Sequence, residues 1–291
     1  MDFFIKRKEM SMKIKTIKNT KQQKLSKLIF DELGIGYNQI QKIIRNKDVK
    51  VDGKRVSKDL DLVSNMVVEV YVQEKLLEIV FENNDIVVVV KPRNIETVSE
   101  SGDDDLKSKI CQQLKTEVFA VHRLDRNTEG LVIFAKNLKA KESLDKAIKN
   151  RKLEKFYLAK VVGVPEKNED KLIAYLKKDE KKSCVFVSDA PMVGYEEIKT
   201  NYKVLSCDES CSILEVALIT GKTHQIRAHL SHIGYPILGD EKYGNSEANK
   251  IFRKKYQCLC AYKLIFHFEK GDYLESLNGF VVELEKDKIK F

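Results

Sequence analysis

The sequence has no long hydrophobic segment. Its purely apolar runs are short, the run at residues 86–90 being as long as any, whereas a helix that crosses a membrane needs roughly 20 such residues. The charged start at residues 1–8 is not followed by the apolar core of a signal peptide. We therefore expect a cytoplasmic protein without a membrane partner.

The sequence also lacks the cysteine and histidine spacings of metal sites. Its histidines at 224, 229 and 232 do not follow the His-x-x-x-His pattern, and no nearby acid completes a ligand set. The six cysteines have neither paired zinc spacing nor the density of a disulfide scaffold, and they lie at positions 111, 184, 207, 211, 258 and 260. We expect free buried thiols, no metal and no cofactor. No long heptad pattern demands an obligate protein partner.

What the sequence does have is an uneven charge. Residues 1–75 hold 17 Lys and Arg against 10 Asp and Glu, a net charge of +7, which leaves 36 against 34, or +2, for the remainder. At 291 residues with 43% apolar content, the chain is long enough for about two domains. A small basic domain fits an acidic polymer such as nucleic acid. A charge that only keeps the protein soluble is the alternative.

The first quarter predicts a small α+β domain after a basic arm. Residues 1–20 carry many cations without an apolar period, so we assign them no fold. Apolar positions then recur at helical spacing, and Asp52-Gly53 suits a tight hairpin turn. The predicted elements are helices at 21–33 and 38–46, a hairpin at 49–56 and a strand at 67–72.

Residues 21–73 resemble the small RNA-binding domain named after ribosomal protein S4. The resemblance rests on residues 40–44 followed by 49–54. It implies that this domain binds RNA through basic side chains, namely Lys24, Lys27, Lys42, Arg45, Lys50, Lys54 and Arg55. A hairpin lined by cations can also serve as a solvated edge that discourages strand pairing.

From residue 76 onward the composition is balanced, and we place a second domain at 76–291. Predicted strands outnumber helices and do not alternate with them regularly, which favours an α+β domain on a mixed or mostly antiparallel sheet. We expect strands at 78–81, 86–90, 131–135, 156–162 and 213–219, and helices at 105–114 and 138–150.

The segment 122–130 presents one carboxylate in a turn before a strand. Asp125 lies between Arg123 and Arg126, and Gly130 closes the turn. Two adjacent cations favour the ionised acid, which suits a carboxylate nucleophile. An Asp that only caps a turn or forms a surface ion pair is the alternative. The segment superficially resembles a kinase catalytic loop, but no glycine-rich phosphate loop precedes it.

A second basic segment follows the predicted strand at 213–219. We expect a helix to begin after Gly221 with Thr223 as its cap, which places Lys222 and free amides where a phosphate can bind. Arg227 lies one turn further along the helix and can point into the same cleft. On the strand at 155–161, Tyr157 shares a face with other apolar residues and by itself indicates a core aromatic.

In this order, the motifs resemble the RluA-type family of RNA pseudouridine synthases over nearly all of residues 76–291. The family's acid motif corresponds to 122–130, its aromatic strand motif to 155–163 and its basic motif to 220–227. Residues 239–240, 243–244 and 260–267 extend the match. An S4-like domain commonly precedes this catalytic domain, so the two resemblances support each other.

The resemblance implies three catalytic residues. Asp125 is the expected nucleophile, Tyr157 the aromatic against the target uracil, and Arg227 the partner of the Asp125 carboxylate. We further expect substrate contacts from the acid and basic motifs, at His122, Arg123, Leu124, Lys222, Thr223, His224 and Gln225. Two positions depart from the family pattern. Glu129 replaces a Ser, and its charge would raise the pKa of Asp125 unless Arg123 or Arg126 compensates. Asn94 replaces a Gly, and Asn can adopt a left-handed turn.

The implied reaction isomerises uridine to pseudouridine in RNA. The residues alone do not choose between attack on the sugar carbon and removal of a ribose proton. Ribosomal RNA of the large subunit is the expected substrate. Transfer RNA is the alternative substrate, and a non-catalytic RNA-binding or ribosome-assembly protein is the alternative class.

Overall fold

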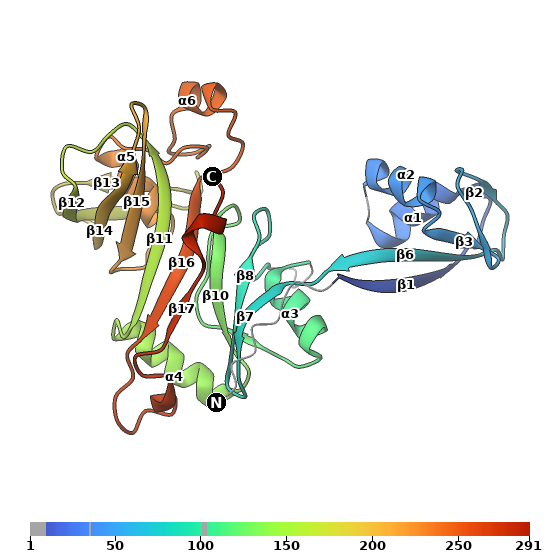
Figure 1. Cartoon of the computed structure of the whole chain (residues 1–291), viewed down its shortest axis with the longest axis horizontal. Coiled ribbons are helices and arrows are strands. Elements are labelled where there is room, and N and C mark those ends of the chain that lie inside the picture. Colours follow the sequence, from blue (N-terminus) through green and yellow to red (C-terminus); the bar gives the residue numbers. More distant parts are fainter. Residues whose placement is uncertain (1–9, 35, 101–103) are drawn as a thin grey trace. The chain divides into compact units, whose positions relative to one another are not determined.

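The computed structural model describes residues 10–34, 36–100 and 104–291, and the chain divides into two compact units (Figure 1). One unit ends at Leu76 and the other begins at Leu77, next to the boundary that we expected near 73–76. Within the described residues, no helix is long and apolar enough to cross a membrane.

The N-terminal unit is a four-stranded sheet with two helices. The sheet has the order β1-β6-β3-β4, and β2 pairs with β5. The expected two helices, hairpin and following strand are confirmed. The elements are β1 (Met10–Lys18), β2 (Gln23–Lys24), α1 (Leu25–Leu33), α2 (Tyr37–Arg45), β3 (Val49–Val51), β4 (Lys54–Arg55), β5 (Asp61–Leu62) and β6 (Val67–Lys75).

One expectation for this unit is wrong. Residues 10–18 of the supposed arm form β1, which pairs with β6 along its whole length. Lys13 and Lys15 follow a spacing of two, but Lys18 breaks it and Lys15 shares its face with the buried Ile17, so neither face of the strand is uniformly apolar. A search for helical periodicity cannot detect this, although Ile17 is buried in the core of the unit. Residues 1–9 of the expected arm lie outside the described residues.

The unit that contains residues 77–291 is built on a mixed sheet of eleven strands, which confirms the expected α+β class. The path runs β13-β12-β14-β15-β11-β16-β10-β8-β7, with β17 paired to β16 and β9 to β10. Only β10 and β16 pair in parallel among the described strands. The strands are β7 (Glu78–Glu82), β8 (Ile86–Lys91), β9 (Phe119–Ala120), β10 (Glu129–Ala135), β11 (Leu153–Val162), β12 (Glu169–Asp179), β13 (Cys184–Ser188), β14 (Glu196–Cys207), β15 (Cys211–Leu218), β16 (Leu259–Phe266) and β17 (Val281–Glu283).

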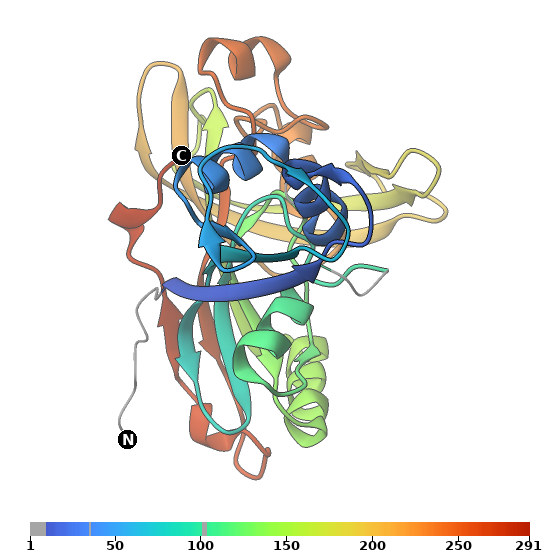
Figure 2. The same ribbon diagram turned by 90° about the vertical axis from the view of Figure 1, so that its right-hand side faces the viewer.

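Helices cover both faces of the central strands. They are α3 (Leu106–Leu114), α4 (Leu138–Lys149), α5 (Gln225–His232) and α6 (Ser246–Ile251), with short 3-10 turns at Glu275–Leu277 and Lys286–Lys288. Strand β8 buries alternate residues in two clusters, with α3 and α5 contributing to one and α4 to the other. Burial on both faces explains why the run at 86–90 is continuously apolar. Helix α6 lies in the long connection between α5 and β16 (Figure 2).

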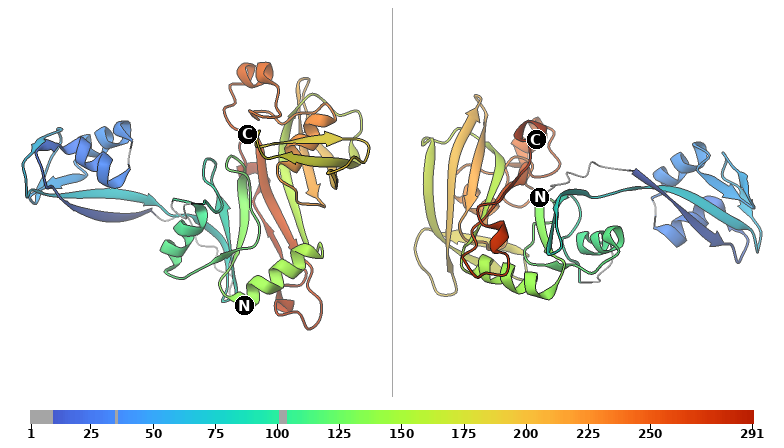
Figure 3. Two further views of the ribbon diagram at one scale, coloured as in Figure 1. Left: turned by 180° about the vertical axis from the view of Figure 1, so that it is seen from behind. Right: turned by 60° about the horizontal axis from the view of Figure 1, so that its bottom comes forward.

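The segment after β16 closes the second cluster. Phe268, Leu274 and Leu277 pack with Ala140 and Leu144 of α4, and the loop lies beside that helix in Figure 3. This packing leaves the other face, with α5 and the loop before β10, to form the site.

Candidate active site

The loop between β9 and β10 carries Asp125 and is fixed at several points. Thr97 Oγ1 accepts a hydrogen bond from Leu124 N at 3.1 Å and donates to Leu124 O at 3.2 Å. Asp125 O accepts from Thr128 N at 3.0 Å. Gly130 has φ 118°, and a Cβ there would overlap the carbonyl of Ala261 on β16. Only glycine therefore allows β10 and β16 to approach beside the turn.

Lys91 fixes the loop that carries Asp125 through hydrogen bonds. This lysine is 0% exposed, and its ammonium donates to the carbonyls of Pro92, Ile95 and Arg126 at 3.0, 2.8 and 2.9 Å. Burial lowers the pKa of Lys91 to about 8, although Asp125 and Glu129 act to raise it. Three carbonyls use all three N–H bonds of the ammonium, so Lys91 positions the turn that presents Asp125.

The charge partner of Asp125 is Arg227 on α5. Arg227 Nη1 donates to Asp125 Oδ2 at 2.8 Å, while Nε and Nη2 donate to Asp240 Oδ2 and Oδ1 at 2.6 and 2.9 Å. The side chain of Asp240 is 0% exposed and that of Arg227 8%. Burial acts to lower the pKa of Arg227, but Asp240 and then Asp125 raise it overall. The guanidinium therefore stays charged and bridges the two carboxylates.

The expectation that Arg123 and Arg126 flank the carboxylate as its cations is wrong. Both are exposed, and within the described residues neither forms an ion pair with Asp125. Glu129 is likewise compensated by a different residue, because Arg93 Nη2 lies 2.6 Å from Glu129 Oε1. Asn94 adopts the expected left-handed conformation, with φ 62°.

The predicted cap of α5 is also wrong. Helix α5 begins at Gln225, its N-cap is His224 in a left-handed conformation with φ 55°, and no side chain caps it. Gln225 fixes this loop instead, since Oε1 accepts from Lys222 N at 3.0 Å and Nε2 donates to Lys199 O at 3.0 Å. Thr223 remains available at the mouth of the site, where it is exposed.

A cavity of about 340 Å³ brings these segments together. Its wall contains all ten residues that we expected to act in catalysis or to contact substrate, which are His122, Arg123, Leu124, Asp125, Tyr157, Lys222, Thr223, His224, Gln225 and Arg227. The volume lies in the range of small-molecule sites. Residues separated by some 100 positions in the sequence thus meet at one cavity.

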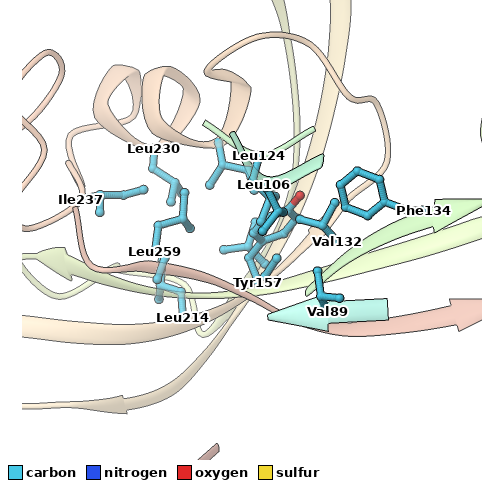
Figure 4. Packing of buried hydrophobic residues seen from close by; sticks show 14 of the residues in the cluster. Val89, Leu106, Leu124, Val132, Phe134, Tyr157, Leu214, Leu230, Ile237 and Leu259 are labelled. Carbon is cyan, nitrogen blue, oxygen red and sulfur yellow. The ribbon is translucent and has the colours of Figure 1, made fainter. Parts of the chain in front are cut away.

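Tyr157 forms part of the floor of the cavity. The residue is 5% exposed, and Figure 4 shows its ring among Leu124, Val132 and Leu259. Burial, followed by the charge of Asp125, raises the pKa of Tyr157. Its hydroxyl is therefore protonated at neutral pH and can donate a proton but not act as a base in the resting enzyme.

The wall histidines have structural contacts. His122 Nε2 accepts from Ile133 N at 3.0 Å, and burial, followed by the charge of Lys155, lowers the pKa of His122 to about 3. His224 Nδ1 lies 2.9 Å from the Tyr243 hydroxyl and its Nε2 lies 3.8 Å from Asp125 Oδ2. Among the described residues, no group of histidines, cysteines and carboxylates could hold a metal.

The buried His229 predicts that the stability of the fold depends on pH. It is 1% exposed, and burial, followed by the charge of His232, lowers its pKa from 6.5 to about 4. Between these two values the unfolded chain binds the proton and the folded chain does not, so stability rises with pH. The contribution of His229 to the free energy of unfolding is fully present above pH 6.5. It is lost as the pH falls toward 4, at up to about 1.4 kcal/mol per pH unit.

Urea unfolding at pH 6.5 and 4.5 measures this effect. His229→Gln, which can keep a hydrogen bond to Thr200, should lose less stability over this interval than the wild type. His267→Gln is the matched control because the side chain of His267 is 47% exposed. Equal pH dependence in the wild type and His229→Gln would show that His229 does not titrate as stated.

The seven predicted RNA-binding residues belong to the N-terminal unit. Lys50 and Arg55 meet over the ring of Tyr71, at 5.2 and 4.9 Å from its centroid. Lys24 pairs with Asp61 at 2.8 Å. The remaining four, Lys27, Lys42, Arg45 and Lys54, are exposed. Lys50 and Arg55 are therefore neighbours on the hairpin of β3 and β4.

Sequence reasoning missed four residues around the cavity. Lys91 is buried against the loop that bears Asp125, and Asp240 is buried against Arg227 of α5. Arg93 pairs with Glu129, and Lys155 lines the cavity. Lys155 is the first residue of the aromatic strand motif and Lys91 ends the predicted strand at 86–90, but a lysine in a sequence predicts an exposed side chain. The sequence placed Asp240 in the extension of the family match at 239–240 but predicted no role for it.

Comparison with known proteins identifies the fold and the family. The model of the RNA pseudouridylate synthase family matches residues 85–232. The dual-specificity RNA pseudouridine synthase RluA of Vibrio parahaemolyticus is 32% identical, covering 69% of this chain and 81% of the relative. Ribosomal large subunit pseudouridine synthase C of Buchnera aphidicola is 28% identical, covering 83% and 82%.

Among solved structures, human RNA pseudouridylate synthase domain containing 1 superposes with a TM-score of 0.58 at 24% identity, covering 65% of this chain and 78% of that one. This similarity shows the fold. The matches in sequence, together with the cavity that unites the acid, aromatic and basic motifs, show that the chain belongs to the RNA pseudouridine synthase family and is an isomerase that converts uridine in RNA to pseudouridine.

Proposed function

We propose that the chain isomerises specific uridines of large-subunit ribosomal RNA, with Asp125 as the nucleophile. The observation that carries the proposal is the Asp125 carboxylate, held at 2.8 Å by Arg227 in the wall of a cavity whose floor is Tyr157. The name of the Buchnera relative and the basic N-terminal unit favour ribosomal RNA.

The geometry of Asp125 leaves one oxygen for chemistry. Arg227 and His224 both approach Oδ2, whereas within the described part of the chain no side chain bonds to Oδ1. Isomerisation breaks the bond from ribose carbon 1 to ring nitrogen 1, turns the uracil and rejoins it through ring carbon 5, which loses its hydrogen. Oδ1 can attack the sugar carbon or remove a ribose proton, and both routes begin from the carboxylate.

The target uridine must leave its stack to reach Asp125. Flipping a base costs a few kcal/mol, which stacking on an aromatic ring and contacts to phosphates offset. Tyr157 supplies the ring. We assign RNA affinity of the N-terminal unit to its exposed cations, as the S4-like pattern of residues 21–73 implies.

Tyr157→Phe tests the role of the phenol hydroxyl. The ring and its packing stay, so RNA binding should be close to wild type. If the hydroxyl transfers a proton at ring carbon 5, kcat should fall by about 10²-fold or more. The assay is the release of tritium from RNA labelled at carbon 5 of uridine. Tyr202→Phe, which makes the same change in the same hydrophobic cluster away from the cavity wall, is the control. Wild-type turnover in Tyr157→Phe would eliminate the proton-transfer role.

Mapping pseudouridine in cellular RNA with and without this protein tests the substrate. Loss of pseudouridine from large-subunit ribosomal RNA alone supports the proposal. Loss from transfer RNA would overturn the ribosomal assignment, and no loss from any RNA would favour the non-catalytic RNA-binding alternative.

A further inference from the structure

Among the described residues, three basic side chains in the cavity wall have no acidic partner. Lys222 pairs with Glu196 and Arg227 with two carboxylates. Arg123, Arg151 and Lys155 line the same cavity, yet no carboxylate of the described residues lies within ion-pair distance of them. Cations that face a cavity without a counter-charge fit an anionic ligand.

Lys155 is the innermost of the three. It lies on β11 two residues before Tyr157, and both side chains face the cavity. A Cβ added at Gly221 would lie 3.5 Å from Lys155 Nζ, so the ammonium reaches the loop between β15 and α5. Its charge also contributes to the lowered pKa of His122. The ammonium therefore lies between the loop that bears Asp125 and the loop that precedes α5.

The position of Lys155 is unfavourable for the protein by itself. Burial lowers the pKa of Lys155, because a partly desolvated ammonium without an anion loses hydration and gains no ion pair. An anion bound beside it would remove this penalty. Methionine at 155 would keep the packing of the aliphatic stem and remove the charge.

Arg151 extends the basic surface along the cavity. It follows α4 in a left-handed conformation with φ 58°, and its N–H donates to Ile148 O at 3.1 Å. Such a conformation is uncommon for a residue other than glycine, and here it ends the helix at the cavity wall. Arg123, on the loop that bears Asp125, supplies the third cation.

We propose that Lys155, Arg151 and Arg123 form a subsite for a backbone phosphate of the nucleotide next to the target uridine. A phosphodiester is an anion present beside every uridine in RNA, whereas the uracil base is neutral and needs no cluster of cations. The inference rests on the proposed entry of the target uridine between Asp125 and Tyr157. In this subsite the ammonium of Lys155 binds RNA, in addition to the packing of its aliphatic stem on β11.

Lys155→Met is the direct test, with affinity measured separately from turnover. The probe is an unmodified large-subunit ribosomal RNA transcript. In an Asp125→Asn background, in which RNA binds without conversion, Lys155→Met should weaken binding about tenfold. The slope of log affinity against log salt should become shallower by about 0.7 for one lost phosphate contact on a single strand. With Asp125 intact, KM should rise by the same factor and kcat should change little.

Two variants separate binding from structure. Lys155→Arg should keep most of the affinity, and the exposed Lys203→Met, outside the wall of this cavity, should leave it unchanged. The midpoint of thermal unfolding of Lys155→Met should equal or exceed that of the wild type, since an unpaired and partly desolvated cation has been removed. A fall in stability with no change in affinity would show a structural lysine and overturn the proposal.

The remaining outcomes distinguish this inference from the proposed function. Unchanged affinity and salt slope in Lys155→Met overturn the subsite even if the wild type forms pseudouridine. Weaker binding by Lys155→Met with no turnover by the wild type supports the subsite and contradicts the proposed reaction on this RNA. If inorganic phosphate raises the midpoint of thermal unfolding of the wild type while RNA affinity is insensitive to Lys155, the site binds free phosphate and the RNA assignment fails.

Discussion

Asp125→Asn is expected to abolish pseudouridine formation in a protein that stays folded and still binds RNA. Asparagine keeps the shape of the side chain and an oxygen that can accept from Arg227, but it cannot serve as the nucleophile. Arg227 retains both of its hydrogen bonds to Asp240, so the buried charge is not left alone. We expect kcat to fall by at least about 10⁴-fold, as for nucleophiles in other enzymes.

Tritium release measures the loss, and the midpoint of thermal unfolding and RNA affinity measure what remains. Asp145→Asn is the matched control, because the one ion pair of Asp145 within the described residues is with Lys141 on the surface of α4. Retained turnover in Asp125→Asn would remove Asp125 from the mechanism. Loss of folding would show instead that Asp125 is a structural partner of Arg227.

The sequence predicted those elements whose signal is local. The hairpin at β3 and β4 follows from Asp52-Gly53, and both residues have the positive φ angles, 46° and 78°, that its turn requires. The strand at 86–90 follows from its apolar run. Strand β1 was missed because its partner, β6, lies some 50 residues away and its lysines suggest solvent. Backbone pairing across that distance leaves no local mark other than an alternation of two.

The site shows the same division between local and distant information. The turn around Asp125 and the face of Tyr157 could be predicted from neighbouring residues. The charge partners of Asp125 and Glu129 could not be predicted in this way, because residues adjacent in the sequence were taken as neighbours in space. The actual partner of Asp125 is 102 positions away and that of Glu129 is 36. The pairing with Arg227 came from the family resemblance, whereas the pairing with Arg93 had no signal at all.

Lysines whose ammonium is buried or partly buried, here Lys91 and Lys155, are the hardest residues to predict. Lys91 is buried because three backbone carbonyls converge on its ammonium, and these carbonyls come from two loops that are distant in sequence. Lys155 is held by β11, whose alternation fixes its side but not its burial. In both cases the ammonium loses hydration, which is unfavourable, at a position where it fixes a loop or lines the cavity.

Arg227→Met is expected to lose both activity and stability, which distinguishes Arg227 from Asp125. The side chain of Asp240 is 0% exposed. After the change, the donors left to its carboxylate among the described residues are the backbone N–H groups of Lys242 and Tyr243, at 2.9 and 3.1 Å. Removing one partner of a buried ion pair costs about 3 to 5 kcal/mol. For a unit of this size the thermal midpoint should fall by about 10 °C.

A double variant separates the two roles of Arg227. In Arg227→Met with Asp240→Asn, the unpaired charge is gone and the asparagine oxygen still accepts from the two backbone N–H groups. The free energy of unfolding should recover by more than half, since a neutral pair at a buried site avoids the desolvation of an isolated charge. Tritium release should remain absent because Asp125 has lost the guanidinium that fixes Oδ2. Recovery of turnover with stability would mean that Arg227 acts only on the fold; failure to recover stability would place the cost in lost packing against Tyr243, whose ring centroid lies 5.2 Å from the guanidinium.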